Sequence, residues 1–267
     1  MDEMEQGGTL GFGVAGTLDH AIVRRLAAAA EEAGYSAFWV NDVPGGEGLA
    51  GLAAAAEVTR GLLLGVGVIP LDRQPAAVIG ARIAELGLPE ERLLLGLGSG
   101  DWKGGLDRVR QGVAELRGLT SARIAVGALA PKMCRLAGEY ADAVLLNWLT
   151  PEYIPESAAR TLEGAQDEGR PQPLIAGYVR VALDEGLERL REESGRYASY
   201  PAYAANFERM GAGAFDTTVH GPDRAAIRAG LAPYQALLEH TVARCIAADE
   251  TEAAYLRVME AAAPGES

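Results

Sequence analysis

The chain alternates short apolar runs with longer segments of helical pattern. Each apolar run is rich in Val, Ile, Leu or aromatic residues and is followed by glycine or turn-forming residues, which is typical of a buried strand. The pattern predicts eight strands, namely Leu10–Gly16, Tyr35–Val40, Leu62–Ile69, the apolar part of Arg92–Trp102, Ala122–Gly127, Ala141–Trp148, Pro173–Leu183 and Thr241–Ala247.

Helices are predicted between the strands, with capping residues such as Asp19 and Thr150 near their starts. No linker or change of composition divides the series, so we predict one domain over residues 1–267, a (β/α)8 TIM barrel. Residues 1–8 are expected to be a disordered tail. The predicted helices are His20–Gly34, about Gly48–Arg60, one ending near Leu86, Gly104–Arg117, one starting at Pro131, one from Thr150 to about Glu168, several within a 184–239 excursion between the seventh and eighth strands, and Asp249–Ala262.

A doubly wound open sheet is the alternative fold. Gly11, Gly13 and Gly16 match the G-x-G-x-x-G spacing of dinucleotide-binding folds. That fingerprint should follow a strand, whereas only the polar N-terminal tail precedes it here. We therefore interpret these glycines as positions where a barrel strand packs closely, and finding them inside a closed barrel would exclude the alternative.

Composition narrows the classes of partner. The chain is 49% hydrophobic with a formal net charge of −13, and its cations are scattered among acids. Nonspecific binding to nucleic acid or to an anionic membrane is not expected, since it needs clustered Lys and Arg. No apolar run is long enough for a membrane span and no secretory signal is recognisable. The distant cysteines Cys134 and Cys245 are expected to be reduced, buried thiols in a cytoplasmic protein.

In a TIM barrel, the site lies on the loops that follow the strands. The histidines His20, His220 and His240 fall outside these loops, so we predict neither a metal site nor a Ser-His-Asp set. Glycine-rich backbone, aromatic side chains and a few polar groups remain. Such a lining suits a flat organic cofactor that carries the chemistry.

Five motifs in order resemble the bacterial-luciferase-like superfamily, and most closely its coenzyme F420-dependent oxidoreductases. The resemblance covers nearly the whole chain and implies a TIM barrel, a small-molecule substrate and a homodimer, for which the alanine-rich helix 50–56 would allow close approach. The motifs are Phe38–Asp42, Leu64–Pro70 with Arg73–Ala76, Arg92–Gly100, Ala128–Met133 with Leu136–Asp142, and Asn147–Glu152.

The resemblance also implies roles for individual residues. Asp42 matches an acid beside the deazaflavin ring, and the third-strand bulge, often a non-proline cis peptide, backs that ring. Pro131 and Lys132 have an independent rationale, because a helix N-terminus beside a lysine attracts the anionic tail of a cofactor. The other implied cofactor-binding positions are Gly67, Val68 and Ile69 in the bulge, Gly98, Ser99 and Gly100 after the fourth strand, and Ala128 and Leu129 after the fifth.

Two departures from the family pattern bear on activity. Sugar-alcohol dehydrogenases of the family carry a histidine base directly after the second-strand acid, where this chain has Val43. Alcohol oxidation of that type is therefore not expected. The chain also lacks a long insertion between Gly100 and Arg123, so we expect the pocket to be open or closed by a partner subunit.

Several side chains keep two interpretations at this stage. Asp101 is either a catalytic proton donor or the N-cap of the next helix, and Asp42 either contacts the ring or caps a turn. Trp148 could form a wall of the pocket. Arg180 could meet a phosphate or form a salt bridge at the barrel mouth, while Trp39 is expected to fill the core.

The predicted function is hydride transfer between reduced coenzyme F420 and a small organic substrate, with Asp101 or solvent supplying the proton. An FMN-dependent monooxygenase is the alternative within the same fold. A noncatalytic barrel that has lost cofactor chemistry is a third reading, motivated by Val43 and the short connection.

Overall fold

The computed structural model describes residues 8–100 and 103–265, and within them nine parallel strands form one sheet. Pairing runs from β1 around to β6, then β6 pairs with β7, β7 with β9 and β9 with β1, so eight strands close a barrel. The strands are β1 (Thr9–Ala15), β2 (Ala37–Asn41), β3 (Leu63–Pro70), β4 (Leu93–Gly98), β5 (Arg123–Ala128), β6 (Ala143–Asn147), β7 (Leu174–Leu183), β8 (Val219–Gly221) and β9 (His240–Cys245).

The barrel strands are the eight predicted from sequence, and the TIM-barrel prediction is confirmed. The ninth strand, β8, lies outside the barrel and was not predicted. It pairs only with the carboxyl end of β7, at Val181–Leu183, outside the closed ring. Three residues are too few to show a periodic pattern, so nothing in this stretch indicated a strand.

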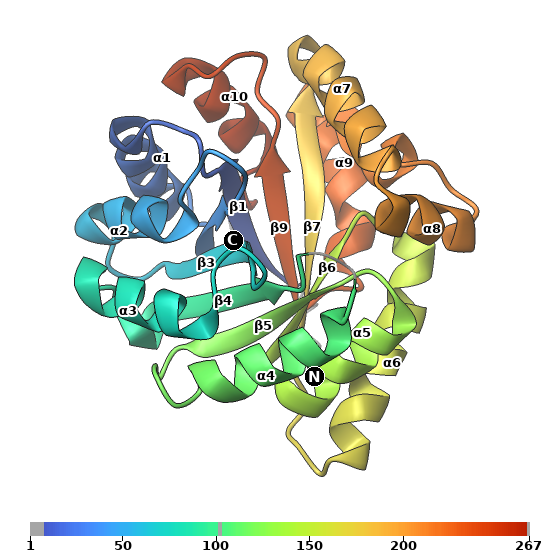
Figure 1. Ribbon diagram of the computed structural model, residues 1–267. Helices are drawn as coiled ribbons and strands as arrows, with labels where there is room; N and C mark the ends of the chain where they lie inside the picture. The colour runs from blue at the N-terminus through green and yellow to red at the C-terminus, as the bar shows by residue number, and fades with distance from the viewer. Residues whose placement is uncertain (1–7, 101–102, 266–267) are drawn as a thin grey trace, which may run out of the picture.

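Helices surround the barrel (Figure 1). Most follow the predicted bounds within a few residues, and Asp19 caps α1 by accepting a hydrogen bond of 2.8 Å from the backbone of Ala21. The α-helices are α1 (His20–Glu32), α2 (Gly48–Val58), α3 (Ala76–Leu86), α4 (Gly105–Leu116), α5 (Pro131–Tyr140), α6 (Ile154–Asp167), α7 (Leu187–Ala198), α8 (Pro201–Met210), α9 (Arg224–Gln235) and α10 (Glu252–Ala262).

The barrel interior is filled by large side chains rather than by a channel. Trp39 is fully buried, its ring lies edge-on to Tyr178 with centroids 5.6 Å apart, and its Nε1 donates to Nε2 of His240 at 2.9 Å. Gly11 and Gly65 make room for this packing, because a Cβ on either would approach Trp39 to 3.0 or 2.2 Å. Trp39 is thus a core residue, and the glycines of the dinucleotide-like spacing lie in a closed barrel, which excludes the open-sheet alternative.

The predicted helical excursion between β7 and β9 contains α7, α8, β8 and α9. In Figure 1, α7 lies beside the carboxyl end of β7, and α8 lies next to α7. Of the predicted N-terminal tail, residues 1–7 lie outside the described residues. Gly8 donates a backbone hydrogen bond of 3.0 Å to Gln235 and therefore belongs to the fold.

Candidate active site

A cavity of about 290 Å³ lies at the carboxyl ends of the strands. We call it the ring cavity. Most of the predicted cofactor-binding residues line it, although they come from loops far apart in sequence, because parallel strands end at the same side of the barrel. Those residues are Asp42, Gly67, Val68, Gly98, Ser99, Gly100, Ala128 and Leu129, and they are joined by Pro70, Gly127, Leu145, Asn147, Tyr178, Tyr197, Ala202 and Tyr203.

Val68 projects from the third-strand bulge onto neighbouring glycines. The peptide bond between Gly67 and Val68 is cis, as the resemblance implied, and the register of β3 against β4 shifts between Val66 and Ile69. A Cβ on Gly98 would lie 2.6 Å from Cγ2 of Val68, and one on Gly127 would lie 2.8 Å from its Cγ1. These glycines therefore make room for the valine side chain that helps to line the cavity.

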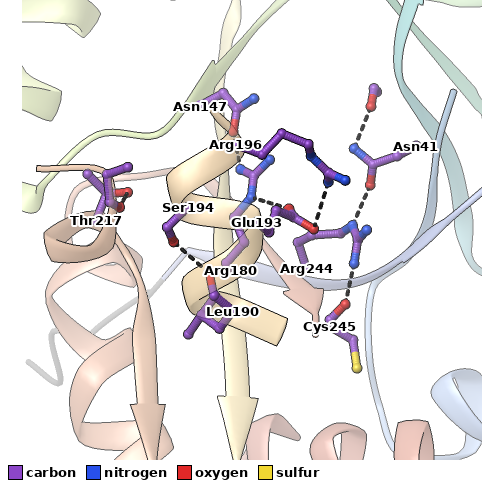
Figure 2. A network of polar contacts seen from close by, with 12 residues as sticks. Asn41, Asn147, Arg180, Leu190, Glu193, Ser194, Arg196, Thr217, Arg244 and Cys245 are labelled. Atoms are coloured by element: carbon purple, nitrogen blue, oxygen red, sulfur yellow. Dashed lines mark hydrogen bonds and ion pairs between the residues drawn. The ribbon is translucent and has the colours of Figure 1, made fainter. Parts of the chain in front are cut away.

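Asn41 and Arg244 hold the bulge from the side. The Asn41 amide nitrogen donates to the Gly67 carbonyl oxygen at 2.7 Å, and its Oδ1 accepts a hydrogen bond of 2.8 Å from Nε of Arg244 (Figure 2). The sequence analysis named neither as a binding residue. Their position at the ends of β2 and β9 was the signal available, since strand ends carry functional side chains in this fold.

Tyr178 contributes a buried polar atom to the cavity. Its hydroxyl has no hydrogen-bond partner among the described residues and lies next to Gly67, 2.6 Å from where a Cβ on that glycine would stand. Burial raises the pKa of Tyr178 well above the ordinary value of 10.0, so the phenol stays protonated at neutral pH. The arrangement leaves one unsatisfied donor beside the bulge, where a ligand acceptor would satisfy it.

The Asp42 carboxylate is used by the protein itself. It accepts a hydrogen bond of 3.0 Å from the backbone of Gly48 at the start of α2 and another of 3.3 Å from Nε2 of Gln74. It also forms an ion pair with Arg73. The side chain is 1% exposed. The capping interpretation is therefore present in the structure, while the residue also lines the ring cavity.

Trp148 and Arg180 do not line the described cavities. Trp148 has a φ of 53° and is buried beside Phe207, with the Arg180 guanidinium 3.8 Å from its ring centroid. Arg180 donates to Glu193 at 3.2 Å and to Asn147, as Figure 2 shows. The predicted pocket wall at Trp148 is corrected, because a buried cation stacks on that indole, and for Arg180 the structure shows the salt bridge of the two interpretations.

Ile69, Pro131 and Lys132 also lie outside the cavity lining. Ile69 is fully buried in the core between barrel and helices. Pro131 begins α5 as predicted, and Lys132 is exposed beside it. Arg209, which the sequence analysis missed, reaches the same turn and donates to the Leu129 carbonyl oxygen at 3.4 Å.

Asp101 lies outside the described residues, so its role stays a prediction. The helix after it begins later than predicted. The N-cap residue of α4 is Gly104, and no described side chain caps the helix, so capping by the Asp101 side chain stays a prediction as well. Gly100, the residue before it, lines the ring cavity with a φ of 68° that favours glycine.

Helices of the excursion cover the ring cavity. Tyr197 comes from the end of α7, and Ala202 and Tyr203 come from α8. We expected the pocket to be open or closed by a partner subunit, because the chain has no long insertion after β4. The covering segment instead follows β7.

A second, larger cavity of about 610 Å³ adjoins the first and shares Tyr197 with it. We call it the arginine cavity. Its walls come from the carboxyl ends of β1 and β9, the loop after β2 and helix α7, and they include Val43, Arg196, Arg244 and Tyr255. Val43, which occupies the position of the family's histidine base, therefore faces this second cavity.

The described residues contain neither a cluster of metal-binding side chains nor a helix that could span a membrane. No three His, Cys, Asp or Glu side chains in residues 8–100 and 103–265 are grouped to hold a metal ion. Within the same ranges, no helix has both the length and the apolar character that crossing a membrane requires.

The chain is similar in sequence to known proteins. A family model described as luciferase-like monooxygenase matches residues 6–104, which carry β1 to β4. The predicted resemblance to the luciferase-like superfamily is confirmed. The chain is also 25% identical over 207 residues to a 5,10-methylenetetrahydromethanopterin reductase of Methanolobus tindarius, in an alignment covering 63% of this chain and 64% of that protein. The chain thus spans less than two thirds of the length of that relative.

Solved structures share the fold of this chain. An F420-dependent secondary alcohol dehydrogenase in complex with an F420-acetone adduct has a TM-score of 0.75 at 15% identity, covering 96% of this chain and 99% of the other. The oxygenating constituent of 3,6-diketocamphane monooxygenase from Pseudomonas putida, in complex with FMN, has a TM-score of 0.69 at 14% identity and 91% of each chain. At these identities the likeness establishes the fold alone.

Proposed function

We propose that this chain is a coenzyme F420-dependent oxidoreductase that transfers a hydride between the deazaflavin and a small organic substrate. The observation that carries the proposal is the ring cavity itself. Glycine-rich strand ends, the Val68 side chain and the unpartnered Tyr178 hydroxyl converge on one cavity. The resemblance to F420-dependent enzymes supports this choice of cofactor.

The residues present fit the ring of such a cofactor. A volume of about 290 Å³ lies near the lower end of the range for small-molecule sites, roughly 300 to 1,000 Å³. The cavity therefore suits a planar heterocycle but not a long tail as well. We place the anionic tail at the start of α5, where the helix N-terminus, Lys132 and Arg209 offer positive charge.

When bound, the cofactor supplies a hydride at C5 of its ring. The protein contributes orientation: Val68 supports one side of the space, and Tyr178 donates a hydrogen bond to an acceptor on the ring edge. Asp101 follows the cavity-lining Gly100 and is the proposed proton donor. Val43 cannot accept a proton, so we propose reduction of an electron-poor double bond rather than oxidation of an alcohol.

An FMN-dependent monooxygenase is the second candidate. The FMN-bound diketocamphane monooxygenase component shares the barrel over 91% of each chain, and a flavin ring has nearly the same shape as a deazaflavin ring. A noncatalytic barrel that has lost its cofactor chemistry is the third candidate, because Val43 stands where the resemblance implies a histidine base.

Spectral titration of the purified chain separates these candidates. Tight binding of F420 with weaker binding of FMN is expected. Tyr178→Phe should weaken F420 binding about tenfold, because one buried hydrogen bond is lost. Tyr140→Phe is the matched control, since Tyr140 lines neither cavity. Tight FMN binding without F420 binding would favour the monooxygenase, and binding of neither would favour the noncatalytic reading.

The assembly and location follow from the resemblance and the composition. We propose a homodimer in the cytoplasm, with the outer face of α2 at the contact. Light scattering coupled to size exclusion tests the dimer, and a monomer at micromolar concentration would count against it.

A further inference from the structure

The arginine cavity is large enough for a substrate and opens beside the ring cavity. The two share Tyr197, so a molecule in the arginine cavity lies next to the proposed cofactor ring. The inference that follows rests on the proposed function, because it concerns the class of substrate.

Arg244 is the unusual group in this cavity. The residue is 7% exposed, and its guanidinium donates to the Asn41 side chain at 2.8 Å and to the Cys245 carbonyl oxygen. Both partners are neutral. Among the described residues, no carboxylate lies within 4 Å of the Arg244 guanidinium, although buried cations are normally paired with an anion.

Two of the three glutamates that line the cavity pair with other arginines, and the third, Glu192, is exposed on α7. Glu193 contacts Arg180 at 3.2 Å and Arg196 at 3.8 Å, and Figure 2 shows it between these two side chains. Burial alone would raise the pKa of Glu193, but the positive charges of Arg244 and Arg180 lower it, so the carboxylate stays ionised. Glu250 pairs with Arg189 at 3.5 Å.

Charge and shape together define what would fit. Arg189 and Arg196 have acidic partners, whereas no carboxylate contacts Arg244 among the described residues. One carboxylate would pair with Arg244, and a dianion would meet more repulsion from Glu192, Glu193 and Glu250, so a monoanion fits better. A guanidinium binds a carboxylate through two parallel hydrogen bonds. The rings of Tyr197, Tyr200 and Tyr255 line the same space and provide aromatic surface.

We propose that the arginine cavity binds the carboxylate of an aromatic acid, with Arg244 contacting the carboxylate and the tyrosines contacting the ring. The acid is the substrate class of the proposed oxidoreductase. Its reducible group lies toward Tyr197, at the wall shared with the ring cavity, while the carboxylate lies toward β9.

Calorimetric titration of the cofactor-free protein tests this without any turnover. Benzoate is expected to bind, and its neutral isostere benzamide should bind at least tenfold more weakly, because it cannot neutralise Arg244. Inorganic phosphate should also bind at least tenfold more weakly than benzoate, since the glutamates repel a dianion. Equal binding of benzoate and benzamide, no benzoate binding, or preferred binding of phosphate would each overturn the proposal.

Variants place the anion at Arg244. Arg244→Lys keeps the charge but loses the planar fork, and should weaken benzoate binding at least fivefold. Arg257→Gln, whose side chain pairs with Glu185 at the surface, is the matched control and should bind benzoate as the unmodified chain does. If Arg244→Lys does not fold, the comparison of benzoate with benzamide still decides the proposal.

F420 titration separates failure of this inference from failure of the proposed function. The unmodified chain should bind F420 with an affinity within about threefold in the presence and absence of saturating benzoate, because the two cavities share only Tyr197. Displacement of benzoate by F420 would assign the arginine cavity to the cofactor and overturn the inference. Benzoate binding in a chain that binds no F420 would leave the acid site standing and refute only the oxidoreductase.

Discussion

The rings of Trp39 and Tyr178 pack in a T-shaped arrangement inside the barrel, between two different polar environments. On one side, the Trp39 indole donates to His240, whose Nδ1 lies 2.8 Å from the Thr9 hydroxyl. On the other, the Tyr178 hydroxyl lies without a protein partner at the ring cavity. His240 at the amino end of β9 is therefore satisfied by the protein, whereas the Tyr178 hydroxyl is left for a ligand.

His240 gives a prediction for stability against pH. Burial, with a smaller effect of Arg123, lowers the pKa of His240 from 6.5 to about 4 in the folded protein. The unfolded chain takes up this proton first, so stability is complete above pH 6.5 and falls as the pH drops from 6.5 toward 4. Between pH 7 and 5 the loss attributable to His240 is about 2 kcal/mol.

Denaturant unfolding of His240→Gln at pH 7 and at pH 5 measures the contribution of His240 to this loss of stability. The glutamine carbonyl can still accept from Trp39, so the variant should fold and lose about 2 kcal/mol less than the unmodified chain on going from pH 7 to 5. His20→Gln, at the exposed first position of α1, controls for removal of a histidine as such. The same pH difference in His240→Gln and the unmodified chain would show that His240 does not contribute.

Asp101→Asn tests the proposed proton donor. Turnover is expected to fall at least tenfold, about 1.4 kcal/mol in the barrier, because an amide cannot deliver a proton. Cofactor affinity should change less than twofold. Asp107→Asn, in the exposed first turn of α4, is the control, and stopped-flow turnover with F420 is the measurement. Unchanged turnover would leave Asp101 without a catalytic role.

At the scale of elements, the ring cavity depends on how β3 lies against β4 and β5. The register shift in β3 turns Val68 toward its neighbours, and glycines on β4 and β5 receive the side chain. Apolar strand pattern predicts the strands, but the bulge arises from the pairing of three of them. Its position was implied by the family motif and not by periodicity.

Gly98→Ala tests this arrangement. The new methyl group would lie 2.6 Å from Cγ2 of Val68, so the valine must move, and we expect F420 affinity to fall at least fivefold. Overpacking of this kind also costs roughly 1 to 3 kcal/mol of stability. Gly195→Ala on α7 has no atom within 4 Å of the new Cβ and should leave affinity unchanged. Fluorescence titration compares them, and equal affinities would contradict the role given to Val68.

At the scale of the whole molecule, the 184–239 excursion gives the barrel a cover and a second cavity. α7 and α8 contribute Tyr197, Ala202 and Tyr203 to the ring cavity, and α7 also forms one side of the arginine cavity. Figure 1 shows α7 near the carboxyl end of β7 and α8 next to α7, on the opposite side of the view from α3. A ligand in either cavity therefore contacts the excursion as well as the strand ends.

Hydrogen exchange should report this contact. Binding of F420 is expected to slow exchange in residues 187–210 at least fivefold, because ligand contacts oppose local opening of α7 and α8. Helix α1 lies against α2 and α10, away from the ring-cavity lining, and serves as an internal control. Slowing confined to β3 and β4, with none in α7 or α8, would show that the excursion does not close over the cofactor.

The sequence by itself determined the barrel. Apolar runs ending in glycine, separated by capped helices, predicted all eight barrel strands, because burial on both faces leaves a continuous hydrophobic signal that needs no knowledge of neighbours. The same logic predicted which loops converge, and eight of the proposed cofactor-binding residues line one cavity.

Only the tertiary structure decided which side chains are available to a ligand. Trp148 and Arg180 were reasonable cavity residues from their strand-end positions, but the Arg180 guanidinium stacks on Trp148 and pairs with Glu193 instead. Tyr178 and Arg244 lie on barrel strands, but no sequence pattern shows that the hydroxyl is unsatisfied or that no carboxylate contacts the cation, because both properties are defined by the surroundings. Those surroundings come from strands and helices far apart in the chain, and no local pattern contains them.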